Sequence, residues 1–443
     1  MFKGNWKILE KSTIKILFFV ILILPFEVSS FTQKAKLMSS DGELGKEGFG
    51  RSVAIHGNIA VVGSPSDDVE NKNSQGAAYV FEQKNGVWNL QQKLVASDGE
   101  AGDWFGSSTA FDGKTLAIGV PGDDLGGNKG QGSVYIYTLD SNVWTLRAKL
   151  NVVYGKSEDH FGTSVAIKGD YLVAGSSANL AYIFKDFNKK NNWIQYAKLS
   201  PPDGEDVGQY SFGKAVAIDG DTVVVGASQQ NGGTGAAYLY NRQVNEVWTL
   251  TTKLDASEGK AHDYFGTSIA IEGNTIAIGA FNDDLDESDI VNGYGSVYIF
   301  TLDDNGWSQQ AKLVASDGEV HDHFGSSIAI KGNTVVIGAP DDDVKGKEAQ
   351  GAAYTFTRNG GNWKQQSKLV ASDGTADDRF GDAVALDTYN NLIAGTGMVN
   401  KLEPGAAYIF KAPSLFDMLK LNTKIKHEEL QLLKPNINYL PHR

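Results

Sequence analysis

The sequence contains no cysteine, which excludes disulfide bonds, thiolate nucleophiles and cysteine-ligated zinc or iron–sulfur centres. Basic residues are outnumbered, because 40 Lys and Arg stand against 53 Asp and Glu, giving a formal net charge of −13. A surface of that sign repels phosphate backbones, so we expect no nucleic-acid partner. Glycine is abundant, with 51 of 443 residues against a usual share of about 7%, and this predicts many tight turns.

Long apolar runs are also missing, since the one sustained run, residues 14–26, is shorter than the ~20 residues that span a bilayer core. Lys3, Lys7 and Lys11 precede this run, Lys15 lies at its start, and Ser29 and Ser30 follow it where a signal peptidase would cleave. The pattern predicts a signal peptide over residues 1–30, with an uncleaved membrane anchor as the alternative. We therefore expect a secreted, periplasmic or cell-surface protein that is not membrane-embedded once the signal is removed.

The dominant feature of the sequence is a Phe-Gly pair that recurs seven times. Successive pairs are 51 to 59 residues apart, a period typical of solenoids, propellers and arrays. The pairs are Phe49-Gly50, Phe105-Gly106, Phe161-Gly162, Phe212-Gly213, Phe265-Gly266, Phe324-Gly325 and Phe380-Gly381.

Each repeat contains four short apolar runs, which we call A to D. In one copy they occupy residues 324–330, 334–340, 351–356 and 363–369. The runs are six or seven residues long, rich in Val, Ile, Tyr and Phe, and bounded by Gly or Asn. These are signals of β-strands, and four strands per repeat fit one blade of a β-propeller.

Residue patterning predicts the order of strands within a blade. Run A is small and apolar throughout, so we expect the innermost strand, buried on both faces. Run D alternates apolar and polar residues, as an outer, half-exposed strand should. Run C keeps one tyrosine in every copy, which we interpret as packing between blades: Tyr79, Tyr135, Tyr182, Tyr238, Tyr298, Tyr354 and Tyr408.

The last repeat predicts how the ring closes. The seventh C run, residues 405–410, has no D run after it, whereas residues 31–37 read as a D run with Phe31 in the place of Trp. We therefore predict an all-β fold, a seven-bladed β-propeller of four-stranded antiparallel blades over residues 31–410, closed by the N-terminal strand. Residues 411–443 form a C-terminal tail whose pattern fits either short helices or disorder.

The seven Phe-Gly pairs, with B-run endings such as GSP (63–65), GVP (119–121) and GAP (338–340), resemble the FG-GAP repeat family. This family is known as the seven-bladed propeller of integrin α-subunits and of many bacterial secreted proteins. The repeat sequences here are most similar to the bacterial branch. The resemblance covers residues 31–410 and implies a binding or adhesion module, but it names no ligand.

One departure from the integrin pattern concerns calcium. Integrin propellers often hold Ca²⁺ in an acidic loop between the first two strands of a blade. Here the same connection is a tight turn such as residues 331–333 or 168–170, which has no room for a cage of oxygen ligands. The calcium sites of the family therefore cannot be transferred to this sequence.

Strands that alternate in direction place the D–A and B–C loops at one end of the ring, which we call the loop face, and the A–B and C–D turns at the other, the turn face. Asp pairs in the B–C loops predict divalent cations, most plausibly Ca²⁺, on the loop face, with solvated acidity as the alternative. One such loop, residues 281–295, fails as an EF-hand. The candidate metal ligands are Asp67, Asp68, Asp123, Asp124, Asp283, Asp284, Asp286, Asp341, Asp342 and Asp343.

Two columns of D–A residues have simpler interpretations. An Asp two residues before Phe-Gly, as in Asp103 and Asp322, is expected to cap the adjoining backbone amides. The residue directly before Phe varies between copies, for example Trp104, His160 and Arg379, which suits recognition better than a shared reaction.

No catalytic motif is present: the chain has no G-x-S-x-G, no H-E-x-x-H and no P-loop. We therefore predict that the protein is not an enzyme but a binding or adhesion module that takes a protein or glycan partner on the loop face. Two alternatives stay open. One is a hydrolytic, carbohydrate-active propeller that uses Asp residues at the channel mouth. The other is a structural module of a surface assembly.

Overall fold

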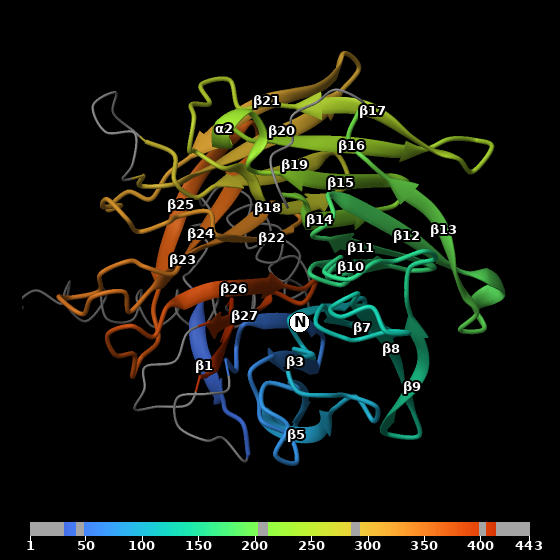
Figure 1. The fold of residues 1–443 in the computed structure, drawn as a ribbon. Coiled ribbons are helices and arrows are strands. Elements are labelled where there is room, and N and C mark those ends of the chain that lie inside the picture. Colours follow the sequence, from blue (N-terminus) through green and yellow to red (C-terminus); the bar gives the residue numbers. More distant parts are fainter. Residues whose placement is uncertain (1–30, 41–47, 203–210, 285–292, 398–404, 413–443) are drawn as a thin grey trace, which may run out of the picture. The chain divides into compact units, whose positions relative to one another are not determined.

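The computed structural model describes residues 31–40, 48–202, 211–284, 293–397 and 405–412. These residues belong to one unit, Phe31–Ala412, which is built of seven four-stranded antiparallel sheets (Figure 1). The predicted all-β, seven-bladed propeller is therefore confirmed. The predicted signal peptide and the tail beyond Ala412 lie outside the described residues. Among the described residues, no helix is long and apolar enough to cross a membrane.

The blades are numbered from the first complete sheet, with strands A to D in order. Blade 1 holds β2 (Ser52–His56), β3 (Ile59–Ser64), β4 (Ala77–Lys84) and β5 (Val87–Leu94). Blade 2 holds β6 (Ser108–Phe111), β7 (Thr115–Val120), β8 (Ser133–Asp140) and β9 (Val143–Leu150). Blade 3 holds β10 (Val165–Lys168), β11 (Tyr171–Ser176), β12 (Leu180–Asp186) and β13 (Trp193–Leu199), with η1 (Phe187–Lys189) before its last strand.

The remaining blades follow the same plan. Blade 4 holds β14 (Phe212–Asp219), β15 (Thr222–Ala227), β16 (Ala236–Arg242) and β17 (Trp248–Leu254), with α2 (Gln230–Gly233) in its B–C loop. Blade 5 holds β18 (Phe265–Glu272), β19 (Thr275–Ala280), β20 (Ser296–Asp303) and β21 (Gly306–Leu313). Blade 6 holds β22 (Ser327–Lys331), β23 (Thr334–Ala339), β24 (Ala352–Asn359) and β25 (Asn362–Leu369).

The seventh blade closes the ring with the N-terminal strand, as predicted. Its strands are β26 (Phe380–Leu386), β27 (Asn391–Thr396), β28 (Ala407–Lys411) and β1 (Thr32–Leu37), so its outer strand is the first strand of the unit. Strand β1 pairs antiparallel with β28, from Thr32 opposite Lys411 to Leu37 opposite Ala407. The inner strand β26 contacts β2, so the first and last blades are neighbours. Without β1, strand β28 would be a free sheet edge.

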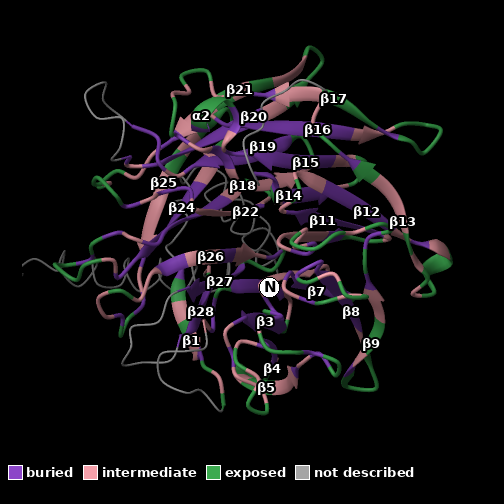
Figure 2. Cartoon of the chain, in the orientation of Figure 1, coloured by how far each residue is buried: buried purple, intermediate pink, exposed green. Residues whose placement is uncertain are grey.

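Burial corrects one prediction about the strands. The B strands β3, β7, β11, β19 and β27 are wholly buried (Figure 2). The A strands β6, β10 and β22 are mostly half-exposed, whereas the A strands β2 and β14 are mostly buried. Run A was expected to be buried on both faces, but it is the innermost strand of each sheet and has no strand of its own blade on one side. The B strand has a strand on either side and a blade above and below. The D strands are half-exposed, as predicted.

The core lies between adjacent blades rather than within one sheet. In one layer, Tyr79 of β4 packs with Phe49, with Ile393 of β27 and with Ile409 of β28. Phe49 and Tyr79 meet edge to face, with ring centroids 5.3 Å apart, a geometry that aromatic pairs prefer. The Tyr residues of run C therefore pack between blades, as predicted.

The two glycines of the repeat motif meet each other across each blade interface. The B-strand Gly119 of blade 2 lies against Gly162, the Phe-Gly glycine of blade 3, so closely that a Cβ on Gly119 would overlap the Gly162 carbonyl oxygen. Gly162 also has a φ of +92°, which L-residues rarely adopt. Ser108 then donates a 2.8 Å hydrogen bond to the Gly162 carbonyl. The spacing of the motif thus reflects a backbone contact that repeats around the ring.

Candidate functional site

The D–A and B–C loops lie together, as the alternation of strands predicts. Asp98 of a D–A loop and Asp123 of a B–C loop both pair with the Lys149 ammonium, at 2.8 and 2.7 Å. At the opposite end, the A–B turns of neighbouring blades meet, since the backbone N–H of Gly273 donates to Asp219 at 2.7 Å. The loop face and the turn face are therefore distinct surfaces.

In each predicted metal-binding pair, with Asp342 and Asp343 as the pair of blade 6, the first carboxylate bonds to side chains of its own blade. Asp342 is 2% exposed, accepts a 2.5 Å hydrogen bond from the Tyr354 hydroxyl and pairs with Lys368 at 2.8 Å. Tyr354 comes from the C strand and Lys368 from the D strand of blade 6. The lysine contact recurs in three other blades, as Lys93–Asp67 (3.0 Å), Lys149–Asp123 (2.7 Å) and Lys312–Asp283 (3.0 Å).

These networks neutralise their own charge. Burial alone would lower the pKa of Lys368, but its bonds to Asp342 and Asp317 raise that pKa above the usual value. Burial alone would raise the pKa of Asp317, but its bonds to Lys368 and Tyr354 lower it. Charge-assisted hydrogen bonds of this kind are roughly twice as strong as neutral ones. In blade 4, whose B–C loop contains no Asp, Gln230 instead accepts a hydrogen bond from the Tyr238 hydroxyl at 3.0 Å.

The second carboxylate of each pair closes its loop. Asp68, Asp124 and Asp343 each accept a hydrogen bond from the backbone N–H six residues later, at 2.7, 2.7 and 2.8 Å. Asp284 is buried, and Asp286 lies outside the described residues. Within the described part of the chain, no three His, Asp or Glu side chains are grouped so as to hold a metal ion. Calcium binding by the ten candidate residues therefore stays a prediction.

The Asp column two residues before Phe-Gly caps the D–A loop. Its carboxylates accept the backbone N–H three residues earlier, as in Glu100 to Asp103 at 2.7 Å and Glu319 to Asp322 at 2.6 Å. Burial raises the pKa of Asp103, Asp263 and Asp322 to about 6, although the backbone bonds act in the opposite direction. The nearby carboxylates that add to each shift include Asp123 for Asp103, Asp283 for Asp263 and Asp342 for Asp322.

The variable residue directly before Phe has an unusual backbone. It lies in the left-handed region with φ between 47° and 57° at Trp104, His160, Tyr264, His323 and Arg379, and blade 1 has Gly48 there with φ of 56°. Bulky L-residues pay about 1–2 kcal/mol for this conformation, which glycine adopts freely. The chain therefore holds large aromatic and basic side chains on the loop face where glycine would fit more easily.

Several of these side chains form one patch across blades 5 to 7, which we call the loop-face patch. Tyr264 stacks on Phe281 at 5.2 Å, and Phe281 meets His323 at 5.3 Å. Asp341, the remaining predicted metal ligand, joins His323 and Arg379 through contacts of 2.5 Å each. Burial alone would raise the pKa of Asp341, but these two partners lower it. Aromatic, histidine and arginine side chains are thus gathered at half-exposed positions.

The Asp–Tyr–Lys networks were not predicted from the sequence. Their signal is nevertheless present, because each D run ends in Lys-Leu and each C run contains a tyrosine. Six of these seven lysines lie over the tyrosine ring of their own blade, for example Lys93 at 5.2 Å from the Tyr79 centroid. A lysine at a fixed sequence spacing after a buried tyrosine would itself be partly buried, so it indicates a nearby acidic side chain that balances its charge.

Comparison with known families agrees with this geometry. A model of the FG-GAP repeat matches seven successive segments, and each begins with the outer strand of one blade and ends in or just after the third strand of the next. This one-strand offset is the sequence counterpart of the ring closure through β1. The matched segments are residues 31–81, 88–137, 144–187, 193–240, 248–300, 307–356 and 363–410.

Proposed function

The chain belongs to the FG-GAP repeat family, and from that premise we propose that it is an exported binding or adhesion module that takes a protein or glycan partner on its loop face. The observation that carries this proposal is the column of large side chains held in a left-handed backbone conformation. Trp, Tyr and Arg are the residue types that dominate binding energy at interfaces. Trp104, which is 41% exposed, and the loop-face patch supply all three.

The position of the column supports recognition rather than architecture. The Phe that follows it is fully buried in all seven copies, for example Phe105 and Phe324, and so fixes the backbone. The preceding side chain then projects from a rigid position, which lowers the entropy lost on binding. Because its identity changes from Trp to His to Tyr to Arg around the ring, the surface is different in each sector.

Calcium remains a subordinate part of the proposal, at blade 5. Asp263 is 1% exposed, and its Oδ1 atom has no hydrogen-bond partner among the described residues. Asp283 and Asp284 both add to the raised pKa of Asp263, so three carboxylates share this region. A divalent cation with oxygen ligands would relieve their repulsion.

The hydrolytic alternative is less well supported. Retaining and inverting glycosidases need two carboxyl groups that face one substrate. The three aspartates with raised pKa, Asp103, Asp263 and Asp322, lie in three different blades and make the same backbone capping bond. Their repetition favours a capping role in the D–A loops.

The test applies the labelled full chain to a glycan array and to immobilised extracellular proteins. The decisive variant combines Tyr264→Ala with His323→Ala, which removes the stacked centre of the loop-face patch. The control is Tyr389→Ala, because Tyr389 is a 59% exposed tyrosine on the turn face. We expect the double variant to lose most binding and the control to keep it. Binding that survives the double variant but fails with Tyr389→Ala would contradict the loop-face assignment.

A further inference from the structure

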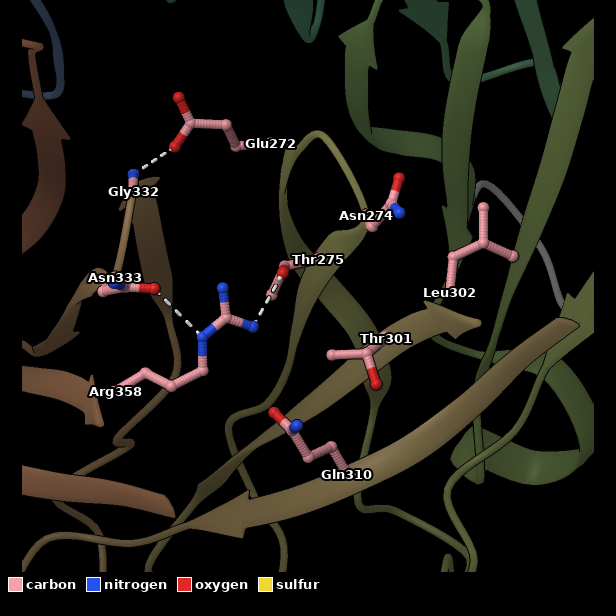
Figure 3. A pocket seen from close by; sticks show the side chains of 9 residues that line it. All are labelled: Glu272, Asn274, Thr275, Thr301, Leu302, Gln310, Gly332, Asn333 and Arg358. Atoms are coloured by element: carbon pink, nitrogen blue, oxygen red, sulfur yellow. Dashed lines mark hydrogen bonds between the residues drawn. The ribbon is translucent and has the colours of Figure 1, made fainter. Parts of the chain in front are cut away.

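A second surface feature lies on the turn face, away from the loop-face patch. An open cavity of about 430 Å³ lies between blades 5 and 6, within the size range of small-molecule sites. Figure 3 shows the side chains around it, which come from the A–B turns, from the ends of the C strands and from β21. Apart from Leu302 and Glu272, its walls are amide, hydroxyl and guanidinium groups: Asn274, Thr275, Thr301, Gln310, Asn333 and Arg358.

Arg358 is held rigidly at the edge of this cavity. Its backbone N–H donates to the Asn333 carbonyl at 2.8 Å, its Nε to the Asn333 side-chain oxygen at 3.1 Å, and its Nη1 to the Thr275 hydroxyl at 3.1 Å (Figure 3). The guanidinium also lies 5.3 Å from the centroid of Trp363. Among the described residues, no carboxylate lies within 4 Å of it, and its Nη2 atom makes no hydrogen bond.

Blade 4 contains the same arginine with its charge balanced. Arg242 occupies the equivalent position at the end of its C strand, and its backbone N–H likewise donates to the A–B turn, to Asp221 at 2.9 Å. Its Nε bonds the Asp221 carboxylate at 2.9 Å, and its Nη1 lies 3.6 Å from Glu246. The turn residue is Asp221 in blade 4 and Asn333 in blade 6, so of these two arginines Arg358 is the one without an acid in its own turn.

The space beside Arg242 is also filled, unlike the space beside Arg358. Tyr171 lies opposite Lys185 in blade 3, and the guanidinium of Arg242 stacks 4.9 Å from the Tyr171 ring. In blade 5 the same register places Thr275 opposite Thr301. Tyr196, three residues before the end of β13, corresponds in the same way to Gln310 in β21. Two tyrosines and a lysine thus correspond to two threonines and a glutamine, and these smaller side chains leave the cavity open.

We propose that this cavity binds the carboxylate of an acidic sugar, a ligand that carries one carboxylate and several hydroxyl groups. Arg358 offers a free guanidinium nitrogen for the carboxylate, which planar guanidinium groups bind well. The side chains of Asn274 and Thr301 and the Gln310 Nε2 make no hydrogen bond to another described residue, so they are available to hydroxyl groups. Glu272 is already bound to Lys331 and to the Gly332 N–H, which offsets its charge.

The experiment measures the affinity of the full chain for D-glucuronate by calorimetry, with glucose and inorganic sulfate as comparison ligands. The decisive variants transplant residues from the filled site between blades 3 and 4: Asn333→Asp supplies the carboxylate that Asp221 provides, and Thr275→Tyr supplies the ring that Tyr171 provides. Both residues occur at the same position in another blade, so both variants are expected to fold. The control is Arg242→Gln, which removes an equivalent charge from the filled site.

We expect glucuronate to bind more tightly than glucose, and each of the two transplant variants to weaken it about tenfold or more, since a charge-assisted hydrogen bond contributes on that scale. Arg242→Gln should leave the affinity unchanged. Equal affinity for glucuronate and glucose, binding of sulfate alone, or glucuronate binding that survives both Asn333→Asp and Thr275→Tyr would each overturn the assignment. None of these outcomes depends on a ligand at the loop face, so the two proposals fail independently.

Discussion

A glycine can be required by a close contact or by a positive φ, and three glycines of blades 2 and 3 distinguish these two causes. Their replacement by alanine is a quantitative test of the fold. Gly119 has an ordinary strand conformation but faces the Gly162 backbone, whose carbonyl oxygen would lie 2.0 Å from an added Cβ. Gly169, in an A–B turn, has a φ of +58° but open space around it. Gly162 combines both constraints, with a φ of +92° and the Ser133 carbonyl oxygen 2.5 Å from an added Cβ.

The expected costs follow from these differences. Gly169→Ala should lose about 1 kcal/mol of unfolding free energy, the cost of a left-handed alanine. Gly119→Ala should lose roughly 2–3 kcal/mol, because overpacking against a backbone cannot be relieved by a rotamer change. Gly162→Ala should lose about 3–5 kcal/mol, since the strain of its conformation adds to the steric overlap. The order, with Gly162 above Gly119 and Gly119 above Gly169, is the prediction.

The measurement is urea unfolding of each variant, followed by far-UV circular dichroism and by tryptophan fluorescence. Coincident transitions from the two probes would justify a single free energy of unfolding for each protein. If Gly119→Ala is no more destabilising than Gly169→Ala, the contact between the two motif glycines does not constrain the blade interface. The repeat motif would then need another explanation.

Three further predictions concern closure, pH and metal. Deleting residues 31–38 should expose β28 as a free edge, lower the melting temperature and cause aggregation; a truncated protein that melts like the full chain would refute closure by β1. Burial raises the folded-state pKa of Asp322 to about 6, so this carboxyl group stabilises the folded state fully below pH 3.8 and that contribution is lost as pH rises through about 6. Asp322→Asn should remove this pH dependence. The variant should therefore melt higher than the wild type at pH 7, and a lower melting temperature would contradict this. Millimolar Ca²⁺ should raise the melting temperature, less so when Asp283 and Asp284 are both changed to Asn but undiminished in Asp219→Asn on the turn face; no shift in the wild type would remove calcium from the proposal.

The sequence was sufficient to predict the blades, their number and the closing strand. These features depend on the pattern of the four apolar runs, which recurs seven times along the chain. The closing strand followed from a mismatch in phase, because residues 31–37 resemble a D run while residues 405–410 lack one. The structure pairs these two segments. Repetition helps because, where one copy has a weak pattern, the other six copies still identify its strands.

The role of the Asp pairs was harder to predict, because their partners are distant in sequence. Asp342 and Lys368 are 26 residues apart and meet only when the C and D strands pair beside the B–C loop. Considered alone, two adjacent carboxylates resemble a metal ligand set. Considered with the lysine that ends each D run, they form an internal ion pair, whose removal on one side would leave a buried charge without its partner.

The burial of run A was predicted correctly for β2 and β14 but not for β6, β10 and β22, for a related reason. Small apolar residues suggested crowding on both faces, but they also suit a strand where seven blades converge at the axis. The inner strands of successive blades contact each other, as β2 does with β6, so small side chains are required by proximity rather than by complete burial. Composition alone does not distinguish these two causes.

The repeats provide their own comparison for identifying positions that serve a ligand. Positions that are kept in every blade, such as the Phe-Gly pair and the tyrosine of run C, are explained by contacts between blades. Positions that differ between blades need another explanation, and the pair Arg242 and Arg358 gives the clearest case. The same arginine is balanced by Asp221 in one blade and faces Asn333 in another, although one substitution would provide the acid. An exposed charge pair of this kind contributes only about 0–1 kcal/mol, so stability alone exerts little selection for or against it. The open space beside Arg358 is the more informative difference, because Tyr171 fills the equivalent space beside Arg242. A polar cavity with an unbalanced arginine is what a carboxylate ligand would require.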